Sequence, residues 1–125
     1  MIDFKGLCFD KRSAVYEQIA LHVKRQIFLG TAHSGDVMPS RRELAAITGV
    51  NPNTAQKAYH LMEDEGIIAT SGNTVSAVVA SDEIKQKIED ELTRGLVSEF
   101  VQNAKSNHLS YKKVIALVSE VWGEE

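Results

Sequence analysis

The stretch SRRELAAITGVNPNTAQKAYH, residues 40–60, contains two helix starts separated by a glycine. Ser40, followed three positions later by a glutamate, forms a capping box in which each side chain bonds the other residue's backbone amide. Gly49 can adopt a positive φ and end the first helix. Asn51-Pro52 then starts another helix, because asparagine caps helices and proline is favoured at the first helical position. Two helices joined by so short a turn must cross steeply, so the sequence predicts a helix-turn-helix.

Elements on both sides of this stretch extend the prediction. Upstream, apolar residues recur at helical spacing and indicate a helix that Ser13 caps and Gly30 ends. Downstream, two β-prone runs, residues 67–70 and 75–79, flank a polar segment with turn formers. We interpret them as a hairpin, with Asn73 as a turn residue rather than a group that reads DNA. A helix-turn-helix followed by such a hairpin is a winged helix-turn-helix.

Residues 81–125 return to a helical pattern. A first apolar stripe has one residue at every fourth position from Ile84 to Phe100, and after a break near residues 107–109, Ser110 caps a second helix. Two helices alone cannot bury both stripes, so we expect a partner surface to cover them. The candidate dimer-interface residues on these stripes are Leu92, Leu96, Phe100, Val114, Leu117, Val118, Val121 and Trp122.

The sequence therefore predicts a mainly α-helical chain with a small β-hairpin. A winged helix-turn-helix domain is expected over residues 1–80 and a two-helix dimerisation segment over residues 81–125. Charge supports this division, because the first part has eight basic and eight acidic side chains, whereas the second has six and nine. The net charge of the chain, −3 at pH 7, thus arises entirely in the second part.

Composition excludes several classes of protein. A chain of 125 residues with 43% hydrophobic residues can build a core, so disorder is not expected as its main state. Its apolar runs are far shorter than the roughly 20 residues that span a bilayer, and the N-terminus lacks a signal-peptide layout. We therefore expect a cytoplasmic protein without a membrane partner. The single cysteine, Cys8, cannot form an internal disulfide.

Catalytic and metal-binding patterns are also missing from the sequence. No nucleophile stands at a recognisable spacing from a base, and no glycine-rich phosphate loop is present. The four histidines stand singly, with no two of them four residues apart to seat a metal. We expect neither an enzyme nor a metal site, and no cofactor.

The predicted third helix is polarised in charge. Its first half, residues 51–57, has no acidic residue, whereas residues 63–65 are all acidic. The positive end of a helix dipole suits phosphate, and Asn or Gln amides can pair with adenine edges in a major groove. The candidate DNA-contacting residues are Asn51, Asn53, Thr54, Gln56 and Lys57, with Arg41 and Arg42 on the preceding helix.

Each of these candidates also has a simpler interpretation. Asn51 can be a helix cap, and Arg41 and Arg42 can be solvated surface charges. Tyr59 has helical spacing with apolar neighbours and is expected in the core rather than as a base-stacking platform. The joint placement of the polar groups at one helix end favours a nucleic-acid surface.

Several linked motifs follow one another in a fixed order: YEQI at residues 16–19, GDVMPSRRELA at 35–45, VNPNT at 50–54, AY at 58–59 and EGII at 65–68. Together they resemble the GntR family of transcription regulators, specifically its short YtrA-like branch. The resemblance is strong over residues 13–80. It implies that Ser40, Arg41 and Arg42 hold the DNA backbone or groove edge, and that Asn53, Thr54 and Lys57 lie on the recognition helix.

The resemblance also implies partners and a role. It indicates a homodimer joined through the tail, bound to double-stranded DNA at a palindromic operator, and often repressing operons for ATP-driven transporters or envelope-stress responses. Two positions depart from the family pattern. Gln56 stands where arginine is common, and residues 71–78 keep one glycine and no basic residue where family wings have an arginine and a Gly-x-Gly-Thr-Phe-Val motif.

Another function is compatible with the same fold. A winged helix can dock another protein through an apolar tail, which the acidic net charge and the plain wing would permit. This alternative predicts no salt-dependent affinity for DNA. The sequence does not identify an effector, and a tail of about 45 residues is too small to enclose a pocket of ~300 Å³ within one chain, which leaves a pocket between protomers.

Overall fold

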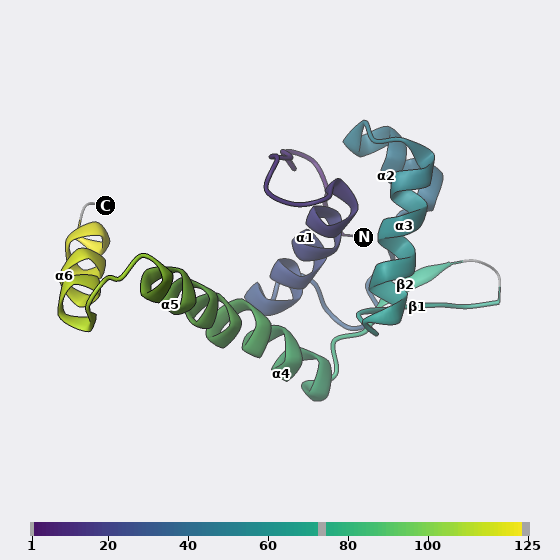
Figure 1. Cartoon of the computed structure of the whole chain (residues 1–125). Helices are drawn as coiled ribbons and strands as arrows, with labels where there is room; N and C mark the ends of the chain where they lie inside the picture. Colours follow the sequence, from purple (N-terminus) through teal and green to yellow (C-terminus); the bar gives the residue numbers. More distant parts are fainter. Residues whose placement is uncertain (1, 73–74, 124–125) are drawn as a thin grey trace. The chain divides into compact units, whose positions relative to one another are not determined.

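The computed structural model describes residues 2–72 and 75–123 and divides into two compact units, Met1–Ile88 and Glu89–Glu125. The first unit contains α1 (Val15–Leu29), α2 (Arg41–Thr48), α3 (Pro52–Asp64), β1 (Ile68–Thr70), β2 (Ser76–Val78) and most of α4 (Asp82–Asp90) (Figure 1). The second contains a π-helical turn, η1 (Glu91–Gly95), followed by α5 (Leu96–Ser106) and α6 (Tyr111–Trp122). This mainly helical architecture with a two-stranded antiparallel hairpin confirms the predicted fold class.

The helix-turn-helix is built by the caps that the sequence predicts. Ser40 Oγ accepts the Glu43 amide at 3.1 Å, and the Glu43 carboxylate accepts the Ser40 amide at 2.9 Å. Gly49 ends α2 with φ +76°, a left-handed conformation that favours glycine. Asn51 then caps α3, its side-chain oxygen accepting the Asn53 amide at 2.8 Å.

The start of α1 differs from the prediction by one residue. Its N-cap is Ala14 rather than Ser13, and the Glu17 carboxylate accepts the Ala14 amide at 3.3 Å. The Ser13 carbonyl instead accepts the Gln18 side-chain amide at 2.8 Å, and the same amide also reaches Asp10. The side chain of Gln18 therefore fixes the segment before α1, which moves the helix start past the serine.

The hairpin is shorter than predicted and is tied to the segment before α2. β1 pairs with β2 so that Ile68 faces Val78 and Thr70 faces Ser76. A bridge between Val37 and Ala77 adds the segment before α2 to the edge of β2. Asn73, predicted to lie in the hairpin turn, falls outside the described residues. The hairpin is thus attached by backbone hydrogen bonds to the same segment that leads into the helix-turn-helix.

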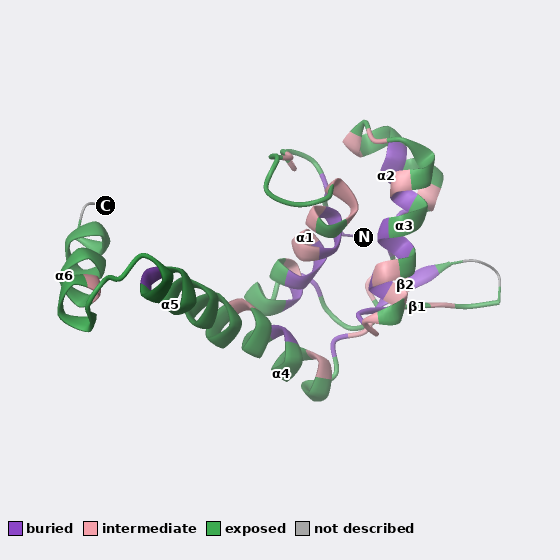
Figure 2. Ribbon diagram, in the orientation of Figure 1, coloured by how far each residue is buried: buried purple, intermediate pink, exposed green. Residues whose placement is uncertain are grey.

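The core of the first unit lies where α1, α2 and α3 meet, and its most buried side chains share these three helices (Figure 2). The large side chains of these helices that are almost completely buried are Ile19, Val23, Leu44, Tyr59 and Met62, and Pro39 and Ile67 beside the helices are buried as well. An ion pair between Lys24 of α1 and Glu65 closes the end of α3. The inner side of α3 is therefore held by both preceding helices.

The two apolar stripes predicted within residues 81–125 differ in how far they are buried. The first residues of the α4 stripe belong to the first unit, where Ile88 is buried and Ile84 lies beside Gly66. Within the described part of the second unit, only Ala104 is buried. Most large apolar side chains of α5 and α6 are exposed, as in Leu96 (64%) and Trp122 (80%). Within residues 2–72 and 75–123, no helix combines the length and hydropathy that a membrane crossing requires.

Candidate nucleic-acid interface

The first half of α3 presents a polar face over a buried one. Asn53, Gln56 and Lys57 are exposed, whereas Ala55 and Ala58, which alternate with them, are fully buried. The small alanines bring the inner side of the helix close to its neighbours and leave the long polar side chains outside. Thr54 is half-buried at the edge of this face. The side chain of Asn51 serves as the helix cap, the simpler of its two predicted roles.

The acidic end of α3 is neutralised by internal partners. Glu63 pairs with Arg41 of α2 at 3.2 Å, and Glu65 pairs with Lys24 of α1. The Asp64 carboxylate lies 3.6 Å from Nε2 of His60, which stands one turn earlier on the exposed side of α3. Because two of the three carboxylates face cations of neighbouring helices, the acidic residues repel DNA less than the sequence suggests.

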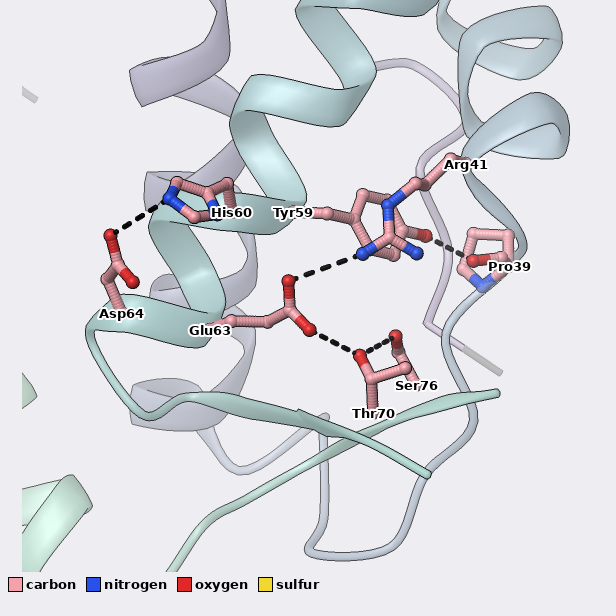
Figure 3. A network of polar contacts seen from close by, with 8 residues as sticks. All are labelled: Pro39, Arg41, Tyr59, His60, Glu63, Asp64, Thr70 and Ser76. Carbon is pink, nitrogen blue, oxygen red and sulfur yellow. Dashed lines mark hydrogen bonds and ion pairs between the residues drawn. The ribbon is translucent and has the colours of Figure 1, made fainter. Parts of the chain in front are cut away.

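Arg41 lies over the Tyr59 ring and takes part in a polar network (Figure 3). Its guanidinium carbon lies 4.6 Å from the centre of the Tyr59 ring, in a cation–π arrangement. The second oxygen of the Glu63 carboxylate accepts the Thr70 hydroxyl at 2.6 Å, and Thr70 lies 2.7 Å from the Ser76 hydroxyl. One network thus joins α2, α3, β1 and β2.

Arg42, the next residue on α2, lies at the surface instead. Its side chain is exposed and, among residues 2–72 and 75–123, has no hydrogen bond or ion pair. Between the start of α2 and the hairpin lies an open groove of about 540 Å³. It is lined by Val37, Met38, Pro39, Ser40, Arg41, Arg42, Glu43, Tyr59, Val75 and Ser76. The structure therefore brings Ser40 and Arg42 together in the lining of one open groove.

Tyr59 belongs to the core, as predicted. The residue is 1% exposed, and its hydroxyl donates to the carbonyl of Pro39, just before α2. Burial raises the pKa of Tyr59 well above its ordinary value of 10, since the phenolate would lose its hydration. At the surface, hydrogen bonds from the Ser40 amide and hydroxyl lower the pKa of Glu43. The hydrogen bonds of the Tyr59 hydroxyl and of the Glu43 carboxylate both stabilise the start of α2.

Sequence reasoning missed Glu63, Thr70 and Ser76, which complete the polar network. In the sequence, Glu63 stands out only as part of an acidic run, and Thr70 and Ser76 occupy ordinary positions in β-prone segments. Their meeting depends on the hairpin register, which places Thr70 opposite Ser76 and both near the end of α3. Among the described residues, no cluster of three His, Cys, Asp or Glu side chains could hold a metal.

Comparison with known proteins agrees with this geometry. Residues 15–75 match the family described as bacterial regulatory proteins, gntR family. The chain is 33% identical to the uncharacterised regulator YhcF of Bacillus subtilis over 86% of this chain and 88% of YhcF. It is 49% identical to the transcriptional repressor YtrA of the same organism over 63 residues, 49% of this chain and 48% of YtrA. A GntR family regulator from Listeria monocytogenes superposes with a TM-score of 0.78 at 30% identity, covering 90% and 98% of the two chains.

These relatives confirm the predicted family and its YtrA-like branch. GntR regulators bind DNA and are not enzymes, so the DNA-binding function is confirmed over the protein-docking alternative. The buried alanine face, the caps of α2 and α3 and the first hairpin strand, β1, all fall within the matched segment, whereas β2 follows it. The chain therefore belongs to the GntR family and is a DNA-binding transcription regulator with a winged helix-turn-helix.

Proposed function

We propose that this regulator binds a palindromic operator as a homodimer, with one α3 helix of each protomer in the major groove. The observation that carries the proposal is the exposed polar face on the first half of α3, which has no acidic residue, together with the exposed Arg42 at the start of α2. Asn53, Thr54 and Gln56 would contact base edges, because amide and hydroxyl groups can hydrogen-bond to them. Lys57, Arg42 and Ser40 would contact phosphates on either side.

The second unit supplies the proposed dimer interface. Most of its large apolar side chains are exposed in the single chain, including Phe100 (49%) and Val121 (62%). Leu92 and Val114 are half-buried. Exposed apolar surface on this scale is costly in water, which supports burial against a second copy. The remaining candidate interface residues are Leu96, Leu117, Val118 and Trp122.

The proposed symmetry has a geometric consequence for regulation. Two recognition helices must lie about 34–36 Å apart to meet successive major grooves on one face of B-DNA. An effector bound between the tails would act by changing this spacing. We propose repression as the outcome, in keeping with the relative that is named a repressor, and an operon for a transporter or a stress response as the target.

The DNA surface is tested by fluorescence anisotropy with duplexes selected from a random library by the wild-type protein, measured over a salt series. Each phosphate contact contributes about 0.9 to the slope of log affinity against log salt. We expect Arg42→Ala and Lys57→Ala each to weaken binding and to reduce this slope. Lys112→Ala, an equal loss of charge on α6, is the control and should leave the slope unchanged.

Gln56→Ala tests base contact separately. Loss of a base contact should relax the selected sequence at one position while the salt slope stays the same. Wild-type affinity and slope in the Arg42 and Lys57 variants would contradict the proposed surface. A selected site without two-fold symmetry would contradict the homodimer on DNA.

A further inference from the structure

The two adjacent arginines at the start of α2 have different surroundings. Arg42 is exposed and makes no hydrogen bond or ion pair within residues 2–72 and 75–123, whereas Arg41 is paired with Glu63 and stacked on Tyr59. We propose that Arg41 is a positioning residue for DNA binding, which holds α3 and the hairpin against α2, and that Arg42 is the arginine of this pair that meets phosphate. The inference rests on the DNA surface proposed above.

The contacts of Glu63 show how Arg41 would act. One carboxylate oxygen of Glu63 accepts from the Arg41 guanidinium at 3.2 Å, and the other accepts from the Thr70 hydroxyl at 2.6 Å. Thr70 in turn lies 2.7 Å from the Ser76 hydroxyl on the paired strand (Figure 3). A single carboxylate at the end of α3 therefore holds α2 on one side and the hairpin on the other.

The position of Arg41 is also too constrained for a phosphate contact. Its side chain is 29% exposed, and its Nε is buried without a hydrogen-bond partner in the described part of the chain. Reaching a phosphate would break the ion pair and the stack on Tyr59 and leave the Glu63 carboxylate without its cation. Breaking a partly buried charge pair is costly because the remaining charge loses its compensation. Arg42 has no such contacts to give up.

Charge gives a second reason to separate the two arginines. Glu63 lies on the recognition helix, so an unpaired carboxylate there would repel the DNA backbone. With Arg41 beside it the pair has no net charge, so Arg42 is the arginine at the start of α2 whose charge is not compensated by Glu63. Removal of Glu63 therefore has opposite effects under the two assignments. It weakens binding if the pair positions α3, and it strengthens binding if Arg41 is a phosphate ligand that Glu63 restrains.

The test uses the full chain and a duplex selected by the wild-type protein, with anisotropy measured over a salt series. We expect Arg41→Met and Glu63→Gln each to weaken binding about threefold to tenfold, as expected for loss of one hydrogen-bonded charge pair. The salt slope should stay near the wild-type value for the pair variant Arg41→Met/Glu63→Met, which leaves net charge unchanged. Arg42→Met should lower the slope by about 0.9 per protomer.

A matched control separates positioning from general effects of charge or stability. Glu65→Gln removes the same charge from the end of the same helix, but Glu65 pairs with Lys24 of α1 rather than with α2 or the hairpin. This control should bind DNA at least as tightly as wild type. Amide exchange provides a readout independent of DNA, and Glu63→Gln should speed exchange at Ser71, whose amide bonds Val75 within the hairpin, more than Glu65→Gln does.

Four outcomes overturn the inference. Glu63→Gln could bind DNA more tightly than wild type, or the pair variant could lose as much salt slope as Arg42→Met. Either result would make Arg41 a phosphate contact and would leave the proposed DNA surface in place. If Glu63→Gln and Glu65→Gln change the affinity for DNA equally, Glu63 affects binding only through its charge and not by positioning α3. If Arg42→Met and Lys57→Ala leave binding intact, the DNA surface itself fails, and the positioning role fails with it.

Discussion

Removing the hydroxyl of Tyr59 tests how α3 is fixed to the start of α2. Tyr59→Phe keeps the ring beneath the Arg41 guanidinium but removes the hydrogen bond to the Pro39 carbonyl. Both Tyr59 and Pro39 are almost fully buried, so water cannot replace the lost donor. A buried acceptor left unpaired costs about 1–3 kcal/mol, and the greater hydrophobicity of phenylalanine offsets part of this cost. We expect the free energy of unfolding to fall by about 1–2 kcal/mol.

Urea unfolding followed by circular dichroism measures this difference. All samples must have the same protein concentration, because association would make stability concentration-dependent. The slope against urea should not change, since the substitution leaves the buried surface nearly the same. Tyr111→Phe is the control, because Tyr111 is 83% exposed and its hydroxyl is in water. A Tyr59→Phe protein with the stability of Tyr111→Phe would refute the buried hydrogen bond as a fixing contact.

Three further predictions follow from the same geometry. The unfolded chain loses the Tyr59 proton near pH 10 and the native state keeps it, so stability should fall by about 1.4 kcal/mol per pH unit above pH 10, and Tyr59→Phe should remove this dependence in urea titrations. Ser40→Ala should cost about 1 kcal/mol by loss of the α2 cap, with Ser110→Ala as a comparison at the α6 cap, both measured by urea unfolding. Glutamate at Leu96 and Val118 together should give folded monomers in sedimentation runs, and a surviving dimer would place the interface elsewhere.

The dependence of stability on pH in the acidic range also tests the α2 cap. The pKa of Glu43 is lowered by its hydrogen bonds from Ser40, so its contribution to stability is present above the ordinary value of 4.5 and is lost as pH falls through the lower native value. We expect Glu43→Gln to flatten the dependence of the urea midpoint on pH below the ordinary value of 4.5. An unchanged pH profile would contradict the role of the Glu43 carboxylate at the cap.

The sequence by itself determined the elements that depend on neighbouring residues. The capping box of α2, the left-handed Gly49 and the Asn51 cap are local, because their hydrogen bonds join residues at most four apart. The burial of Tyr59 likewise follows from the helical spacing of apolar residues. The GntR likeness adds the family and its DNA-binding function, since linked motifs in one order identify relatives.

Only the tertiary structure decided which way equivalent charges face. Arg41 and Arg42 are chemically identical neighbours, yet successive positions on a helix lie about 100° apart, so one meets Glu63 and the other meets solvent. Glu63 finds Thr70 because the hairpin folds back onto α3, a contact that spacing along the chain does not encode. Long-range pairing of polar groups depends on how elements pack, and local patterns contain no information about that choice.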